Sequence, residues 1–330
     1  MDAKETAPAE THGNPPEISP EPIVHPAETQ PSSTLPMQEI FFGPAGLRWG
    51  WRLFLYLATG TVIYLVLGSF ASQFPHHGTG RLWLEMYIQV LLVVAVVAPA
   101  FVMGAIEHRP FGAYGLPRAG VFGKQFWVGS VWGIVALSCL MLALRGAGAF
   151  YYGHLAIHGE RILKFGAFYA VLFLFVGFFE EFTFRGYTQF TVANGIGFWP
   201  TAVILSLIFG ALHLANPGEA WVGALCAGLI GFFFCFTLHR TGTLWFAVGM
   251  HASWDWGESF LYSVPDSGGM STGHLLNSSF HGPRWLTGGS VGPEGSALVF
   301  VVIAVVWVAF DRVYPEVKWQ AESGSRLSDQ

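Results

Sequence analysis

The chain has 330 residues, of which 52% are hydrophobic and only 11% are charged, and its mean hydropathy is +0.47. Because soluble globular domains carry about a quarter charged residues, this composition excludes an ordinary soluble protein and indicates a protein of the lipid bilayer. The net charge of −5 at pH 7 argues against nucleic acid as a partner.

The N-terminal segment differs in composition from the rest of the chain. Residues 1–36 are rich in proline, glutamate, threonine and alanine and almost lack aromatic side chains. Such a segment cannot bury enough apolar surface to offset the entropy lost on ordering it. We therefore expect a disordered cytoplasmic tail over 1–36, a membrane-embedded domain over 37–319 and a polar C-terminal tail over 320–330.

Long apolar runs follow this tail and continue almost to the end of the chain. A helix needs roughly 20 apolar residues to cross the hydrocarbon core of a bilayer. The runs predict an all-α fold, a polytopic membrane bundle of about eight transmembrane helices, near residues 51–73, 82–106, 122–144, 165–192, 198–215, 220–239, 244–264 and 297–314.

The distribution of basic residues predicts the orientation of these helices. With the N-terminus inside, most of the 16 Lys and Arg residues fall in cytoplasmic segments, as the positive-inside rule requires. We expect an integral multi-pass protein with both termini in the cytoplasm, in the plasma membrane if the host is bacterial.

Ionisable residues inside three of the spans are the strongest indication of function, because each costs roughly 2.5 to 3.5 kcal/mol on insertion scales. The fourth span contains Glu180, Glu181 and Arg185. Glu181 and Arg185 are four residues apart with the acid first, the favourable order for an ion pair along a helix. Glu180 then points elsewhere and needs a partner on another span.

The other two spans supply histidines at a similar depth. The fifth span ends at His213, and the seventh carries His251 and, one turn later on the same face, Asp255. Counted from the cytoplasmic turns at a rise of about 1.5 Å per residue, these groups and Glu180 lie within a turn or two of one layer. We therefore expect one site shared by three helices.

These motifs resemble those of a known family. The patterns Glu180-Glu181-x-x-x-Arg185, Phe209-x-x-x-His213 and His251-x-x-x-Asp255 are similar to the three motifs of the CPBP intramembrane proteases, which include CAAX prenyl endopeptidases and bacteriocin-processing or immunity membrane proteins. The resemblance implies an endopeptidase that cleaves a membrane-bound protein or peptide.

The resemblance also implies roles for single residues. Glu180 and His213 would activate water, Glu181 and Arg185 would hold the helix and its charge balance, and His251 and residue 255 would stabilise the oxyanion. The commonest family pattern has Asn at the position of Asp255. An ionised carboxylate cannot donate a hydrogen bond to an oxyanion, so the chain departs from the pattern at a functional position.

Two questions stay open at the level of sequence. Zinc could use the two imidazoles and two carboxylates of Glu180, His213, His251 and Asp255, although the chain has no HExxH motif and a metal-free glutamate mechanism is equally compatible. Similar buried charges also occur in proton-coupled transporters, and a non-proteolytic immunity or scaffold protein is a third alternative. The lack of an internal repeat argues against the transporter.

Overall fold

The structure is a computed structural model that describes residues 1–2, 37–44, 46–75, 79–216 and 218–319. Most of the predicted N-terminal tail and the predicted tail over 320–330 lie outside the described residues. The chain divides into two compact units, Met1–Ile40 and Phe41–Gln330. The short helix α1 (Met37–Phe41) begins in the first unit, and all other described elements belong to the second.

Helices form most of the described part of the second unit, and every predicted span contains one. They are α2 (Trp49–Gly68), α3 (Thr79–Ile106), α4 (Lys124–Gly146), α5 (Glu160–Arg185), α6 (Tyr187–Ile196), α7 (Phe198–His213), α8 (Trp221–Thr241), α9 (Trp245–Trp256), α10 (Arg284–Thr287) and α11 (Ala297–Val313). A π-helical turn, η4 (Gly257–Tyr262), continues α9, and the 3₁₀ turn η5 (Pro293–Gly295) precedes α11.

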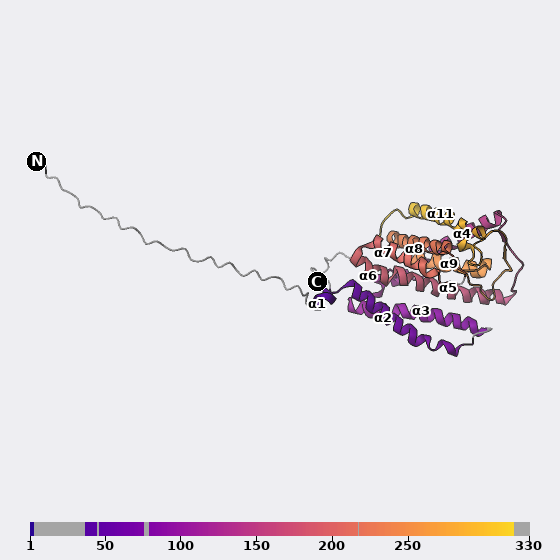
Figure 1. The fold of residues 1–330 in the computed structure, drawn as a ribbon, viewed down its shortest axis with the longest axis horizontal. Helices are drawn as coiled ribbons and strands as arrows, with labels where there is room; N and C mark the ends of the chain where they lie inside the picture. The colour runs from indigo at the N-terminus through magenta and orange to yellow at the C-terminus, as the bar shows by residue number, and fades with distance from the viewer. Residues whose placement is uncertain (3–36, 45, 76–78, 217, 320–330) are drawn as a thin grey trace. The chain divides into compact units, whose positions relative to one another are not determined.

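Within the described ranges, five segments are long and apolar enough to cross a membrane by length and composition, namely α2 with the following turn, α3, α4, the combined α5–α6 segment and α8. The helices α7, α9 with η4, and α11 are shorter and lie alongside them (Figure 1). The predicted all-α polytopic bundle is confirmed.

The helix pairs place α5 and α9 in the middle of the bundle. Helix α2 packs on α3, α3 on α5, α5 on α9 and α9 on α4, while α7 packs on α8 and α11 contacts both α4 and α8. Figure 1 shows α2 and α3 along one side of the bundle and α11 and α4 along the other. The helices that carry the three motifs are therefore held between these outer pairs.

Large apolar side chains cover the outer faces of several helices. Leu65 of α2, Leu207 of α7 and Val305 of α11 are 64%, 68% and 63% exposed. So many exposed large apolar side chains are unusual on a soluble protein, and lipid accommodates them. The chain is an integral, multi-pass membrane protein.

Glycines bring α4 and α9 into close contact. A Cβ added at Gly129 would lie 2.1 Å from the carbonyl oxygen of Phe246, and one at Gly133 would lie 2.3 Å from that of Met250. Small residues four positions apart allow this approach of two helix backbones in membranes. This contact holds α9, the helix that carries His251, against α4.

The predicted fourth span, near residues 165–192, lies within one candidate membrane span, Glu160–Ile196, but that span starts earlier and its helix is interrupted. Helix α5 begins earlier, at Glu160, and the segment breaks at Gly186 into α5 and α6. A Cβ at position 186 would lie only 2.4 Å from the carbonyl oxygen of Phe182. Glycine, the weakest ordinary helix former, thus permits a tight corner immediately after Arg185.

Two short strand pairs, which the all-helical prediction does not include, join loops. Strand β1 (Phe42–Gly43) pairs with β2 (Gly46–Leu47), and β3 (Phe150–Tyr151) pairs antiparallel with β4 (Ser279–Phe280). The second pair connects the α4–α5 loop with the long loop before α11.

A buried charge outside the motifs ties together α2, the end of α3 and α6. Glu107 forms an ion pair with Arg52 at 3.1 Å and accepts hydrogen bonds from the hydroxyls of Tyr187 at 2.5 Å and Tyr114 at 3.3 Å. These three partners account for the charge of Glu107, which is 6% exposed, so we interpret the cluster as structural.

Candidate active site

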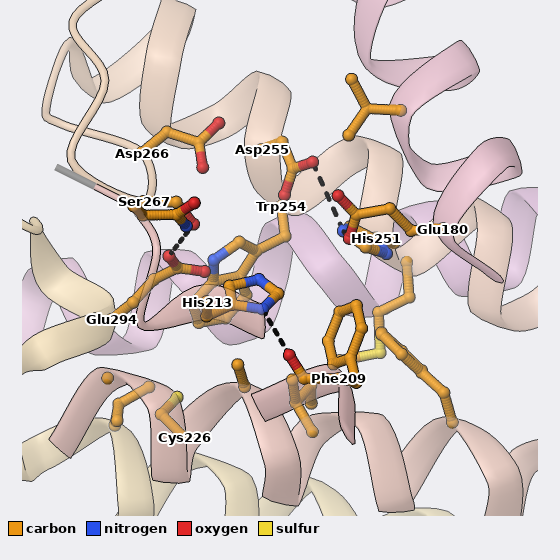
Figure 2. Close-up of a pocket in the computed structure, with 18 of the residues that line it drawn as sticks. Glu180, Phe209, His213, Cys226, His251, Trp254, Asp255, Asp266, Ser267 and Glu294 are labelled. Carbon is orange, nitrogen blue, oxygen red and sulfur yellow. Dashed lines mark hydrogen bonds and ion pairs between the residues drawn. The ribbon is translucent and has the colours of Figure 1, made fainter. Parts of the chain in front are cut away.

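A cavity of about 590 Å³ lies among the motif-bearing helices. Its walls come mainly from α5, α7, α8, α9 and α11, with contributions from α4, the α7–α8 loop, the loop after η4 and η5. Glu180, His213, His251 and Asp255 all line it, and Figure 2 shows these four side chains around the same space. Sequence analysis placed α5, α7 and α9 here but missed the contribution of α8 and α11.

The two adjacent glutamates have different surroundings. The side chain of Glu180 is 26% exposed and lines the cavity, whereas that of Glu181 is fully buried. Glu181 Oε1 lies 3.3 Å from Nη1 of Arg185, which is also fully buried. The i,i+4 ion pair forms as its spacing predicts, and Glu180 is the glutamate that water in the cavity can reach.

Arg185 occupies a space bounded by aromatic rings and a glycine. Its guanidinium carbon lies 4.4 Å from the ring centroid of Phe209 and 5.9 Å from that of Phe234, distances typical of cation–π contacts. A Cβ at Gly231 of α8 would lie 2.1 Å from Nη2 of Arg185. Gly231 therefore leaves the room in which the guanidinium sits.

His251 connects the carboxylates of α5 and α9. Its Nδ1 lies 2.9 Å from Oε1 of Glu181, while its Nε2 lies 3.6 Å from Oε2 of Glu180 and 3.5 Å from Oδ2 of Asp255. The ring stacks on Phe234 with a centroid distance of 5.7 Å. Three carboxylates thus surround one imidazole.

His213 is held by its own helix. Nδ1 lies 2.8 Å from the carbonyl oxygen of Phe209, to which it donates in the tautomer that carries its proton there, and the ring lies 4.5 Å from that of Phe209. Among the described residues, His213 forms no hydrogen bond or ion pair with Glu180, His251 or Asp255. With Nδ1 occupied, Nε2 remains for a ligand in the cavity.

Three further acids line the end of the cavity formed by the loops: Glu219, Asp266 and Glu294. Glu219 accepts a hydrogen bond from the backbone N–H of Ala220 at 2.9 Å, and burial raises the pKa of its carboxyl. Burial, together with the nearby charges of Asp255 and Glu294, raises the pKa of Asp266 well above its usual range. Sequence reasoning missed all three, because no spacing in the sequence connects them.

The comparisons with known proteins identify one family. Residues 162–257 match the family model described as "Rce1-like: Type II CAAX prenyl endopeptidase Rce1-like". No curated protein matches the chain. The matched segment runs from α5 to the end of α9 and contains all three motifs. Residues 162–257 are therefore similar to the Rce1-like type II CAAX prenyl endopeptidases, and the resemblance of the three motifs to CAAX proteases is confirmed.

Proposed function

We propose that the chain is an intramembrane endopeptidase that hydrolyses a peptide bond of a membrane-associated protein or peptide. One observation carries the proposal: of two adjacent glutamates, Glu181 is neutralised and buried by Arg185, while Glu180 faces a cavity that also contains two histidines. A structural charge cluster does not need the second, accessible carboxylate.

Glu180 is the proposed general base. Its carboxylate takes a proton from a water molecule in the cavity, and the oxygen of that water attacks the carbonyl carbon of the scissile bond. His213, with Nδ1 held by Phe209, orients the same water through Nε2. The proton then passes from Glu180 to the leaving nitrogen as the carbon–nitrogen bond breaks, and the products are a carboxylate and an amine.

His251 is the proposed oxyanion donor. Glu181 accepts the hydrogen bond of Nδ1 and fixes the orientation of the ring, so that Nε2 is directed toward Glu180 and Asp255 at the cavity wall. A proton on Nε2 can then stabilise the negative oxygen of the tetrahedral intermediate, the type of interaction that contributes most in many hydrolases. Glu181 and Arg185 act through His251 and are positioning residues.

Glu180, His213, His251 and Asp255 are of the residue types that bind zinc, but among the described residues their ligand atoms do not gather within 4.8 Å of one another, so side chains would have to move to hold the ion together. A ligating histidine commonly donates its other ring N–H to a carbonyl or carboxylate, and His213 and His251 both have such a partner on Nδ1. A bound zinc ion would lower the pKa of its water and polarise the substrate carbonyl. Elemental analysis of the purified protein before and after chelation separates this version from the metal-free one.

The test uses purified protein in detergent, a library of membrane-derived peptides and mass spectrometry of the products. We expect cleavage by the unaltered chain, loss of cleavage in Glu180→Gln and His213→Ala, and retention in the matched control Glu219→Gln, which alters another carboxylate of the same cavity. Cleavage that survives in both active-site variants contradicts the proposal. Proton-coupled solute flux in liposomes that the same two variants abolish would indicate a transporter.

A further inference from the structure

Three carboxylates outside the family motifs converge at the loop end of the cavity. They are Glu258 in η4, Asp266 in the following loop and Glu294 in η5, and one oxygen of each lies within 4.8 Å of the others. Asp266 and Glu294 line the cavity and are labelled in Figure 2. The proposed hydrolytic steps use none of the three.

Glu258 distinguishes this cluster from a group of acids exposed on the surface, because its side chain is buried. Its side chain is 0% exposed, and neither of its oxygens has a hydrogen-bond partner of ordinary geometry. A fully buried carboxylate without a donor is strongly unfavourable. The side chain is also directed at the other two acids, because its oxygen is one of the three that converge.

The surrounding residues supply little positive charge. Asp266 accepts a hydrogen bond from the hydroxyl of Ser259 at 3.2 Å, and Glu294 accepts one from the hydroxyl of Ser267 at 2.9 Å. In the part of the chain that the structure describes, no lysine or arginine forms an ion pair with any of the three acids. The cluster lacks the cation that would balance it.

The backbone holds these acids in place although they are distant in sequence. Gly292 has a φ of +106°, and a Cβ there would lie 2.0 Å from the carbonyl oxygen of Pro265, so only glycine allows this contact beside Asp266. The N–H of Gly268 donates to the carbonyl oxygen of Val291 at 3.0 Å. On the third side, the π-helical turn that carries Glu258 is of a type frequent at functional sites.

We propose that Glu258, Asp266 and Glu294 bind a divalent cation of the hard, oxygen-seeking class, with calcium as the best fit. Calcium takes carboxylate and other oxygen ligands at about 2.3 to 2.6 Å, so ligands on opposite sides of the ion lie up to about 5 Å apart. The three oxygens, all within 4.8 Å of one another, are compatible with that spacing. Calcium is preferred to magnesium because it accepts six to eight oxygen ligands in flexible geometry, whereas magnesium usually keeps several waters and binds only one or two carboxylates.

The cation has a defined structural effect. It joins Glu258, at the end of the seventh span, to Asp266 and Glu294 at the two ends of the long loop before α11, and Asp266, Ser267 and Glu294 belong to the cavity wall. Binding therefore fixes one wall of the cavity. The site does not depend on the proposed peptide hydrolysis, and its tests measure binding and stability.

The experiment titrates the purified, EDTA-treated full-length protein with calcium by calorimetry and with terbium by luminescence excited through tryptophan, since Trp254 also lines the cavity. We expect one ion per chain. Affinity falls about tenfold or more in Glu258→Gln and Glu294→Gln, since each variant removes one charged ligand. Glu219→Gln and Glu180→Gln, which alter other cavity carboxylates, retain the affinity.

Thermal unfolding distinguishes a variant that has lost calcium binding from one that folds poorly. In EDTA we expect Glu294→Gln to unfold at the same temperature as the unaltered protein or higher, because one of three repelling carboxylates is gone. With excess calcium the unaltered protein gains several degrees and the variant does not. The proposal is overturned if the unaltered protein binds no calcium at millimolar concentration. It is also overturned if Glu258→Gln and Glu294→Gln both bind calcium as tightly as the unaltered protein. Either result would mean that bound protons, and not a metal ion, neutralise the three carboxylates.

Discussion

The buried ion pair between Glu181 and Arg185 leads to a prediction about stability and activity. Removing Arg185 should destabilise the protein, and removing Glu181 as well should restore its stability but not its activity. Both side chains are 0% exposed, their charged atoms are 3.3 Å apart, and Arg185 also contacts the ring of Phe209. Removing one member of a buried pair leaves an uncompensated charge and costs about 3 to 5 kcal/mol. We expect Arg185→Met to lower the free energy of unfolding by that amount.

Replacing both partners should reverse most of this loss, because apolar residues of similar volume often match the stability of a buried ion pair. The double variant Arg185→Met, Glu181→Leu is therefore expected to unfold near the unaltered protein. It should still fail to cleave peptide, since Nδ1 of His251 has lost its acceptor at 2.9 Å.

The assay is reversible unfolding in mixed detergent micelles, followed by cleavage measurements on the same samples. Helix α5 offers a matched control, Lys164→Met, which breaks the ion pair with Glu160 at the same i,i+4 spacing but with both side chains largely exposed. An exposed pair of this kind contributes only about 0.2 to 1 kcal/mol. An Arg185→Met variant as stable as this control, or a double variant no more stable than Arg185→Met, would refute the reasoning.

Three further outcomes follow from other contacts. Gly231→Ala should destabilise the protein, because the new Cβ would lie 2.1 Å from Nη2 of Arg185 and would displace the guanidinium. The control Gly228→Ala, whose new Cβ would have its nearest neighbour 3.4 Å away, should be tolerated, and thermal unfolding compares the two variants. Asp255→Asn should retain or raise the rate of peptide cleavage, because an amide can donate to the oxyanion; a loss as large as that in the general-base variant would show that the carboxylate is required. Tyr187→Phe should cost about 1.5 to 3 kcal/mol of unfolding free energy by removing a hydrogen bond to the charged Glu107, and a value below about 0.5 kcal/mol would show that water replaces the hydroxyl.

The sequence predicts much of the fold because a bilayer demands long apolar runs, and each of these runs contains a helix. The break at Gly186 was missed, since a single glycine does not by itself end a helix in sequence. The ion pair of Glu181 with Arg185 follows from helical periodicity alone, because it depends only on local geometry.

Contacts between helices and loops could not be predicted in the same way. Periodicity places His251 and Asp255 on one face, but it does not show that Glu181 of another helix accepts the hydrogen bond of His251. The convergence of Glu258 with Asp266 and Glu294 depends on a π-helical turn and on loop conformation, neither of which has a repeating sequence pattern.

The central claim is that Glu180 activates a water molecule for peptide hydrolysis. Cleavage of a membrane-derived peptide in water enriched in ¹⁸O, with mass spectrometry of the new C-terminus after a single turnover, tests it most directly. The account predicts one ¹⁸O atom in the carboxyl group formed by the unaltered chain, with no product from Glu180→Gln at equal folded concentration. Labelled product at an unchanged rate from Glu180→Gln would contradict it.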